Sequence, residues 1–265
     1  MSWLERPILA VDTETSGPNP DWARIVTATI VVLTPGQPTW DVQTHTWLAD
    51  PGVEIPAGAT AVHGISSERA RAEGRPAAEV VAEVTTMLGR ALSKGTPVVA
   101  YNGAFDLTVL DREGRRHGIR TLSDGLGDVS PILDPHVLDK RLDRFRKGSR
   151  KLAATAKHYG VALSEDDAHD ATADAMAAVR VLWRMAAAYP EMREQTLHEL
   201  HAMQIRWRAE QAASLQTYLR KKDPTATVNP AWPIQPLPDG WDPSYHPDDD
   251  QPAAVSTPPL TGSDA

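Results

Sequence analysis

The chain has 265 residues, 41% hydrophobic and 23% charged, with a formal net charge of −8, which is ordinary for one sizeable globular core with appendages. It contains no cysteine, and this excludes disulfides, thiolate metal sites and cysteine nucleophiles. The N-terminus has no basic region followed by a long apolar segment, and no run approaches the ~20 apolar residues of a membrane span, so we expect a cytoplasmic protein without membrane contact.

The first predicted element is a buried strand that begins at Ile8 and ends in two acids. Ile8 to Val11 form a short apolar run, and Asp12 and Glu14 follow it before a turn at Ser16 and Gly17. Side chains alternate along a strand, so the two carboxylates point the same way. They repel each other unless a positive charge lies between them. A metal ion between them is one interpretation, and two solvated turn acids are the other.

Further strands and helices predict a mixed sheet with helices packed on it. Residues 24–33 and 39–48 are rich in β-branched residues and favour two more strands, joined to the first as an antiparallel meander. After them, strands alternate with helices, which is typical of an α/β fold. The expected elements are a helix at 76–95, a strand at 97–101, and helices at 104–118, 150–159 and 171–188.

Two more segments hold acids where site residues are common. Asp106 lies at the start of the helix that follows the buried strand 97–101. In "AHDATADA", His169 and Asp174 lie five positions apart and cannot share a helix face, so they converge only if the helix begins at Asp170. The alternatives are acids that complement helix dipoles and an incidental loop histidine.

The end of the chain differs from the rest in composition. Pro190 precedes another helical pattern at about 191–221. Residues 223–265 contain ten prolines and seven aspartates but no Lys, Arg or Glu, so they account for most of the negative charge. We expect this tail to be disordered or extended. Its exposed aromatic residues, Trp232, Trp241 and Tyr245, suggest a docking peptide; an acidic nucleic-acid mimic and a tail without a partner are the alternatives.

The ordered set of motifs resembles a known family. "VDTETSG" resembles the first motif of the DEDD-type 3′–5′ exonucleases of the histidine subclass, "VVAYNGAFDLTVL" resembles the second and "HDATADA" the third. "VHGISSE" is similar to a segment common in proofreading members. The resemblance covers about residues 5–188 and implies a ribonuclease-H-like fold. Tyr101 and Gly103 depart from the usual His and Ala of the second motif, and His169 separates the chain from the tyrosine subclass.

The resemblance implies a two-metal mechanism, and hard carboxylate ligands suit Mg²⁺ or Mn²⁺. Asp12 would bridge two ions, Glu14 and Asp174 would complete the first site, and Asp106 would hold the second. His169 would be the general base, and nucleoside 5′-monophosphates would leave the 3′ end. The expected substrate-binding residues are Thr15, Ser16, His63, Asn102 and Phe105. The basic run 139–151 is expected either to be a solvated face or to hold the strand through Arg144, Arg146, Lys147, Arg150 and Lys151.

These motifs lead to one main hypothesis and two alternatives. The main hypothesis is a 3′–5′ exonuclease for single-stranded or 3′-ended DNA, in proofreading or repair. The alternatives are an exoribonuclease that trims RNA ends, because the same chemistry serves both sugars, and a non-catalytic nucleic-acid-binding module with a nuclease-like core. The expected units are an exonuclease domain at 1–188, a helical segment at 189–222 and the tail at 223–265, with a protein partner for residues 190–265.

Overall fold

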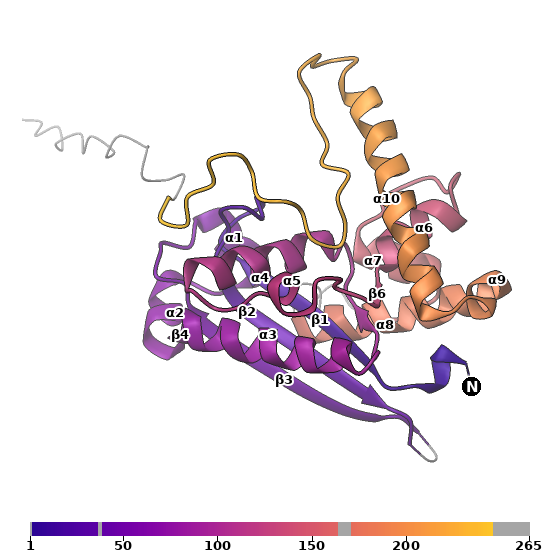
Figure 1. Ribbon diagram of the computed structural model, residues 1–265, viewed down its shortest axis with the longest axis horizontal. Helices are drawn as coiled ribbons and strands as arrows, with labels where there is room; N and C mark the ends of the chain where they lie inside the picture. The colour runs from indigo at the N-terminus through magenta and orange to yellow at the C-terminus, as the bar shows by residue number, and fades with distance from the viewer. Residues whose placement is uncertain (1, 37–38, 164–170, 246–265) are drawn as a thin grey trace, which may run out of the picture.

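The computed structural model describes residues 2–36, 39–163 and 171–245, and a six-stranded mixed sheet lies at its centre (Figure 1). The strand order is β4-β3-β2-β1-β5-β6. The three long strands are antiparallel neighbours, as the sequence predicts: β1 (Ile8–Thr15), β2 (Ile25–Thr34) and β3 (Asp41–Asp50). Apolar residues of β1 and β2 are almost fully buried, and this explains the short continuous apolar runs in their sequences.

Three short strands extend the sheet at its two edges. β5 (Val98–Val99) pairs parallel to β1, and β6 (Ile132–Leu133) pairs parallel to β5. β4 (Arg75–Pro76) pairs with β3 at the other edge. Because β1, β5 and β6 run parallel, their carboxyl ends lie side by side at one end of the strands, where sites of α/β folds commonly form. Asp12, Asn102 and Asp134 all lie at these carboxyl ends or just beyond them.

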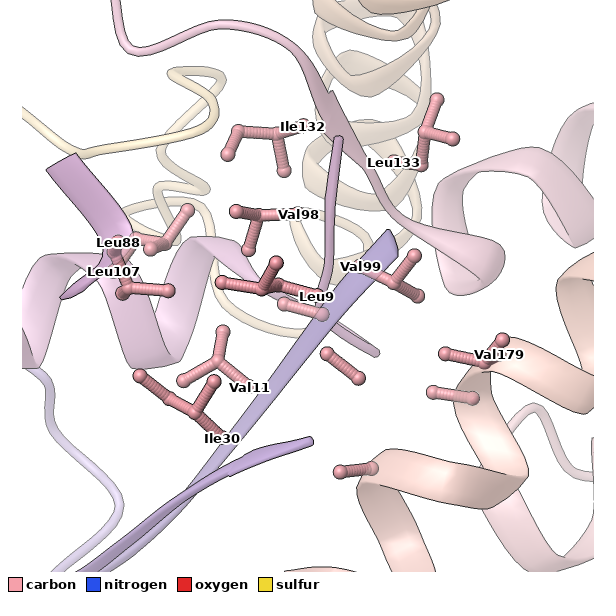
Figure 2. Close-up of a cluster of buried hydrophobic side chains, with 14 of the residues drawn as sticks. Leu9, Val11, Ile30, Leu88, Val98, Val99, Leu107, Ile132, Leu133 and Val179 are labelled. Atoms are coloured by element: carbon pink, nitrogen blue, oxygen red, sulfur yellow. The ribbon is translucent and has the colours of Figure 1, made fainter. Parts of the chain in front are cut away.

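Helices cover both faces of the sheet. Figure 2 shows Leu88 of α3 (Ala77–Ser93) and Leu107 of α4 (Ala104–Arg116) packed on one side of β1, while Val179 of α8 (Ala171–Ala188) lies on the other side. The side chains of Leu88, Leu107 and Val179 are all completely or almost completely buried. The predicted helices at these positions are confirmed, and their apolar stripes form the core. None of the described helices has the length and apolarity that crossing a lipid bilayer requires.

Apart from the long helix at Leu197–Leu219, the remaining helices are short, and most of them lie outside the predicted elements. They fill the connections between longer elements, where no apolar periodicity can develop over a few residues. Of these, α7 corresponds to a predicted helix, and α9 corresponds to the first residues of the helix predicted at about 191–221. The short helices are η1 (Trp3–Glu5), α1 (Ala57–His63), α2 (Ser67–Glu73), α5 (Leu122–Leu126), α6 (Pro135–Leu142), α7 (Leu152–His158) and α9 (Pro190–Glu194).

The single helix predicted at 191–221 is divided into α9 and a long second helix, α10 (Leu197–Leu219). Thr196 begins α10 with a capping box. Its hydroxyl accepts the Glu199 N–H at 3.2 Å, and the Glu199 carboxylate accepts the Thr196 N–H at 2.8 Å. These bonds satisfy amide groups at the helix start, so a new helix begins there instead of continuing from α9.

The C-terminal segment, residues 223–245, contains no helix or strand, which fits the extended alternative of the predicted disordered or extended tail better than the disordered one. It is irregular, but it runs from the end of α10 back across α4 (Figure 1). Trp232 is only 5% exposed, and its indole N–H donates to Asp134 Oδ2 at 3.3 Å. Trp241 stacks near Trp22, with ring centroids 6.2 Å apart. Proline prevents a helix here but does not prevent burial of aromatic side chains.

The expectation of exposed docking aromatics is therefore wrong for Trp232, and Trp241 contacts Trp22 of this chain. The Arg116 guanidinium also lies 5.4 Å from the Trp241 ring centroid. Residues 246–265, which complete the predicted tail, lie outside the described residues.

Candidate active site

Asp12 and Glu14 lie near the carboxyl end of β1 and point to the same face of the sheet. Asp12 lies opposite Thr29 of β2, and Glu14 lies opposite Thr27. Both acids are half-buried, in contrast to the fully buried apolar residues that precede them in the strand. Their face is the one that α8 covers, because Leu9 and Val11, on the alternate positions, pack toward α3 and α4 (Figure 2).

Asp106 reaches the same strand from the first turn of α4. Its Oδ1 atom accepts two hydrogen bonds from Thr13, one from the backbone N–H at 3.0 Å and one from the hydroxyl at 2.7 Å. β5 is paired with β1 only as far as Ala10, so it does not reach the Thr13 N–H. That N–H donates to the Asp106 carboxylate instead. Burial raises the pKa of Asp106, although the Thr13 hydrogen bonds act in the opposite direction.

Asp174 is supplied by the first turn of α8, the helix that covers the Asp12 face. The prediction that it faces inward is consistent with its position in the wall of the same cleft as Asp12 and Glu14. His169, the predicted general base, lies outside the described residues.

One cleft of about 630 Å³ joins all four predicted acids. It is open to the surface at the edge where β1 and β5 end, and polar side chains from several elements form its walls. Besides the four carboxylates, its lining includes Thr13, Tyr101, Asn102, Phe105, His136, Arg150, Lys151 and Leu152. Segments that are far apart in the sequence thus converge on one site, as the ordered motifs predict.

The donor set of the cleft fits hard divalent cations. Four carboxylates supply oxygen ligands, which Mg²⁺ and Mn²⁺ prefer, and no cysteine competes with them. Burial destabilises the charged form of Asp106, and a cation in the cleft would stabilise it. Within residues 2–36, 39–163 and 171–245, however, no three His, Asp or Glu side chains are grouped as a ready-made metal cluster.

The loop after β5 brings Asn102 and Phe105 into the cleft wall. Asn102 has a φ of 60°, which few residues other than glycine adopt, and this conformation is held by Asp134. The Asp134 carboxylate accepts the Asn102 N–H at 2.9 Å and the Gly103 N–H at 3.1 Å. A Cβ atom on Gly103 would lie 2.6 Å from the Ala100 Cβ, so the glycine allows the close turn into α4.

Tyr101, which replaces the family's usual histidine, has a structural contact of its own. Its hydroxyl donates to the Arg150 carbonyl at 2.5 Å and lies 2.8 Å from Thr155 Oγ1. Burial raises the pKa of Tyr101 well above its usual range, so the phenol stays protonated. The side chain therefore fixes the segment before α7 against the cleft.

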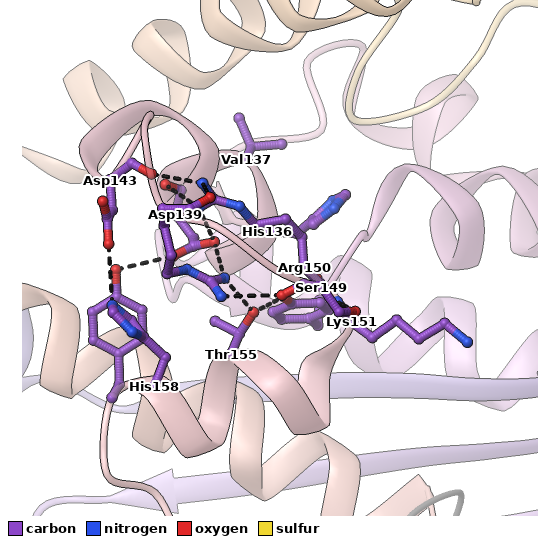
Figure 3. Close-up of polar contacts among 12 residues, drawn as sticks. His136, Val137, Asp139, Asp143, Ser149, Arg150, Lys151, Thr155 and His158 are labelled. Carbon is purple, nitrogen blue, oxygen red and sulfur yellow. Dashed lines mark hydrogen bonds and ion pairs between the residues drawn. The ribbon is translucent and has the colours of Figure 1, made fainter.

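Two residues of the predicted strand-binding run are occupied by an internal ion-pair network (Figure 3). The buried Asp139 carboxylate accepts hydrogen bonds from Arg146 and Arg150, both at 2.6 Å, and from the Tyr159 hydroxyl at 3.0 Å. Burial alone would raise the pKa of Asp139, but the two guanidinium groups hold it below its usual value. Arg146 and Arg150 thus have a structural role, and Arg150 also lines the cleft.

The other members of that run are exposed. Lys151 extends from the network toward solvent (Figure 3) and lines the cleft, whereas Lys147 and Arg144 are not among its lining residues. The Arg144 guanidinium lies 5.8 Å from the ring centroid of Phe145, which is 88% exposed. The structure thus brings Arg150 and Lys151 to the cleft.

Three of the predicted substrate-binding residues are not among the described residues that line the cleft: Thr15, Ser16 and His63. The Thr15 hydroxyl donates to the Gly17 carbonyl at 2.9 Å, and the Ser16 hydroxyl accepts the Arg24 N–H at 2.9 Å. Both bonds close the turn between β1 and β2. His63 ends α1, and its Nδ1 atom accepts the Ile65 N–H at 3.2 Å.

Sequence reasoning missed Asp134, which holds the Asn102 loop, and His136, which lines the cleft. Both lie at the junction of β6 and α6 in "ILDPHVLDK". The Asp-Pro pair there is a signal for a helix start, because Asp caps the first turn and Pro fits its first position. It could have located α6, although not the bonds to Asn102 and Gly103.

Comparison with known proteins gives a consistent picture. The model of the RNase_T family, described as exonuclease, matches residues 9–182. A DNA polymerase III subunit epsilon-like protein of Rhodobacter capsulatus is 30% identical over 141 residues, which are 53% of this chain and 18% of that protein. All four cleft carboxylates lie inside the family match, whereas α9, α10 and the C-terminal segment follow it.

Solved structures of exonuclease I have the same fold. The Escherichia coli enzyme in complex with a dA16 oligonucleotide has a TM-score of 0.61 and 20% identity, over 71% of this chain and 42% of that one. The Methylocaldum szegediense enzyme has a TM-score of 0.57 and 20% identity, over 70% and 41% of the two chains. The chain thus spans about a fifth of the length of the curated relative and about two fifths of these structures.

Proposed function

The chain belongs to the RNase_T exonuclease family, and from this premise we propose that it is a metal-dependent 3′–5′ exonuclease of single-stranded DNA. The observation that supports this proposal most is the convergence of Asp12, Glu14, Asp106 and Asp174 on one open cleft. A cleft lined by four carboxylates repels a phosphodiester, so it suits this substrate only if divalent cations neutralise the acids.

In the proposed site, Asp12, Glu14, Asp106 and Asp174 would hold two Mg²⁺ or Mn²⁺ ions. Such ions, when bound, stabilise the negative charge on the attacking and leaving oxygens of an in-line displacement. Thr13 fixes Asp106 Oδ1 with two hydrogen bonds, so this carboxylate keeps one orientation during the reaction. The Asn102 loop forms the wall where Asn102 and Phe105 would contact the terminal nucleotide.

We assign the general base to His169 on the basis of its motif. A histidine has the near-neutral pKa that suits removal of a proton from the attacking water. The reaction then breaks the bond between phosphorus and the 3′ oxygen of the preceding nucleotide and releases a nucleoside 5′-monophosphate. A role in proofreading or repair would follow from removal of nucleotides at a DNA 3′ end.

Single-stranded DNA is the proposed substrate for two reasons. Escherichia coli exonuclease I, which shares the fold, is described in complex with single-stranded DNA oligonucleotides. The curated relative is described as similar to a DNA polymerase subunit. The cleft is open at the surface and is bordered by Arg150 and by the exposed Lys151, whose ammonium group can meet the phosphates of an approaching strand.

The test uses the full chain with 5′-labelled single-stranded DNA and RNA of the same sequence, in Mg²⁺, Mn²⁺ or EDTA. A ladder that shortens from the 3′ end of DNA, faster than on RNA and absent in EDTA, is the expected result. Asp12→Asn and His169→Ala should each reduce kcat by roughly 10²-fold or more, because each removes a group that acts on the transition state. Asp41→Asn, an exposed acid of β3, is the matched control.

A faster ladder on RNA would replace the DNA proposal with the exoribonuclease alternative. A folded chain that binds Mn²⁺ and either strand but cleaves neither would contradict the proposed catalysis and support the binding-module alternative.

A further inference from the structure

Two positive side chains, Lys140 and Arg208, and a neutral histidine, His136, lie near the cleft on two helices, α6 and α10. His136 and Lys140 are four residues apart on α6, so they share one face of that helix. Arg208 belongs to α10 and lies close enough that its charge affects both of them. All three side chains are half-buried. Among the described residues, neither Lys140 nor Arg208 has an ion-pair or hydrogen-bond partner for its side chain.

Hydrogen bonds fix the face of α10 that presents Arg208. Gln204, one turn before Arg208, accepts the Asp134 N–H at 2.7 Å and donates to the Ile132 carbonyl at 3.1 Å. Gln211, one turn after it, donates to the Val137 carbonyl at 3.0 Å. Residues 204, 208 and 211 follow the helical repeat, so Arg208 lies on the side of α10 that contacts β6 and α6.

The nearby carboxylates are already engaged by other groups. Asp134 accepts N–H groups of Asn102, Gly103 and His136 and of the Trp232 indole. The Asp139 carboxylate accepts hydrogen bonds from the guanidinium groups of Arg146 and Arg150. The positive charges of Lys140 and Arg208 therefore remain uncompensated by a direct contact.

The charged groups also affect one another. Burial, followed by the neighbouring charges of Lys140 and Arg208, lowers the pKa of His136 to about 3. Burial and the charge of Arg208 likewise lower the pKa of Lys140. The positive charges of Lys140 and Arg208 repel each other in the free protein, and a bound anion would reduce this repulsion.

We propose that Lys140 and Arg208, with His136 between them and the cleft, form a binding site for the phosphodiester backbone of the strand behind its 3′ end. The site is continuous with the cleft, because His136, Arg150 and Lys151 line the cleft itself. The inference rests on the proposed function for its ligand, a single-stranded nucleic acid. It gives α10, which lies beyond the family match, a role in holding the substrate.

The test compares Arg208→Gln and Lys140→Gln with the unaltered chain on two substrates, a dinucleotide and a 12-nucleotide strand. A dinucleotide has only the reacting phosphodiester, so it cannot use a second phosphate site. For the longer strand, each variant should raise KM roughly fivefold and leave kcat unchanged, whereas KM for the dinucleotide should not change. Arg206→Gln is the matched control, because Arg206 is an exposed arginine of the same helix.

A second measurement separates this inference from the proposed activity. Binding of the labelled 12-nucleotide strand is followed by fluorescence anisotropy in Mg²⁺ at several salt concentrations, with His169→Ala added to every chain so that the strand is not cleaved during the measurement. Loss of one phosphate contact should reduce the slope of log K against log salt by about 0.7 for a single strand. If the chain binds but does not cleave, and the variants bind more weakly, the inference stands and the proposed activity fails. If the chain cleaves both substrates and the two variants behave like Arg206→Gln, the inference is overturned.

Discussion

At the scale of single residues, the contact between Thr13 and Asp106 has the clearest consequence. The Thr13 hydroxyl donates to a buried carboxylate that lines the cleft. We predict that Thr13→Val weakens metal binding, because it removes a charge-assisted hydrogen bond that orients Asp106 and favours its ionised form. The Mg²⁺ concentration for half-maximal activity should rise about tenfold, as for other residues that support metal ligands. Measuring the exonuclease rate at increasing Mg²⁺ concentrations gives this half-maximal concentration.

Thr13→Ser is the matched control, because it keeps the hydroxyl and removes only a methyl group. It should retain a metal requirement close to that of the unaltered chain. If the Val and Ser variants shift the titration equally, the effect comes from packing in β1, and the hydrogen bond has no role in orienting Asp106.

The four acids that the sequence singles out all line one cleft, and each lies in a motif that contains its own local signal. Asp12 and Glu14 follow a buried strand, and Asp106 and Asp174 begin helices. Residues that support them were not predictable in the same way. Asp134 contacts Asn102 across 32 residues, and Thr13 contacts Asp106 across 93, so neither bond has a local pattern. The basic run was misleading for Arg146, because its charge is matched by a buried acid in α6.

At the scale of elements, the C-terminal segment is a structural part of the domain. Trp232 is buried against the core, and Arg112, which is fully buried, donates to the carbonyls of Gln235 and Pro236 at 3.0 and 2.7 Å. We predict that a chain ending at residue 222 loses roughly 3–5 kcal/mol of its free energy of unfolding, the typical cost of removing one buried Trp side chain. Arg112 would also lose two acceptors, which adds to this cost. Urea unfolding followed by tryptophan fluorescence or circular dichroism measures the change.

A chain ending at residue 245 is the control, since it keeps every contact described for the segment. Its urea midpoint should match that of the full chain. Equal midpoints for all three chains would mean that the segment contributes nothing to stability, and the expectation of a plain disordered tail would be correct after all.

Element prediction succeeded where a periodic signal was long enough. β1, α3 and α8 have continuous apolar runs or helical stripes, and their positions were predicted within a few residues. β6 has only two residues, too few to show a pattern, and α6 was missed although the Asp134-Pro135 pair at its start signals a helix. The packing of the C-terminal segment could not be predicted for a different reason. Its prolines exclude regular structure, but its path depends on the partners of Trp232 and Trp241, which composition does not encode.

At the scale of the whole molecule, α10 joins the C-terminal segment to the sheet, and this junction contains a buried histidine. His201 is 2% exposed; its Nδ1 atom accepts the Ile132 N–H at 3.1 Å, and its ring lies 4.9 Å from that of Trp232. Burial lowers the pKa of His201 below its usual value. The neutral ring is thus part of the folded state, and the unfolded chain takes up a proton at higher pH than the folded chain does.

We therefore predict a specific pH dependence of global stability. Below about pH 6.5, where an unfolded histidine becomes protonated, the contribution of His201 to stability should fall, by up to about 1.4 kcal/mol per pH unit for one proton. His201→Asn keeps an acceptor for the Ile132 N–H but does not titrate, so the variant lacks this loss. The difference in unfolding free energy between the unaltered chain and His201→Asn should thus narrow from pH 7.5 to pH 5 in urea titrations. The comparison cancels the titration of every group that both chains share, including the buried acids of the cleft. A constant difference in unfolding free energy across this pH range would therefore show that His201 has the same pKa in the folded and unfolded chain. The α10 junction would then not couple stability to pH.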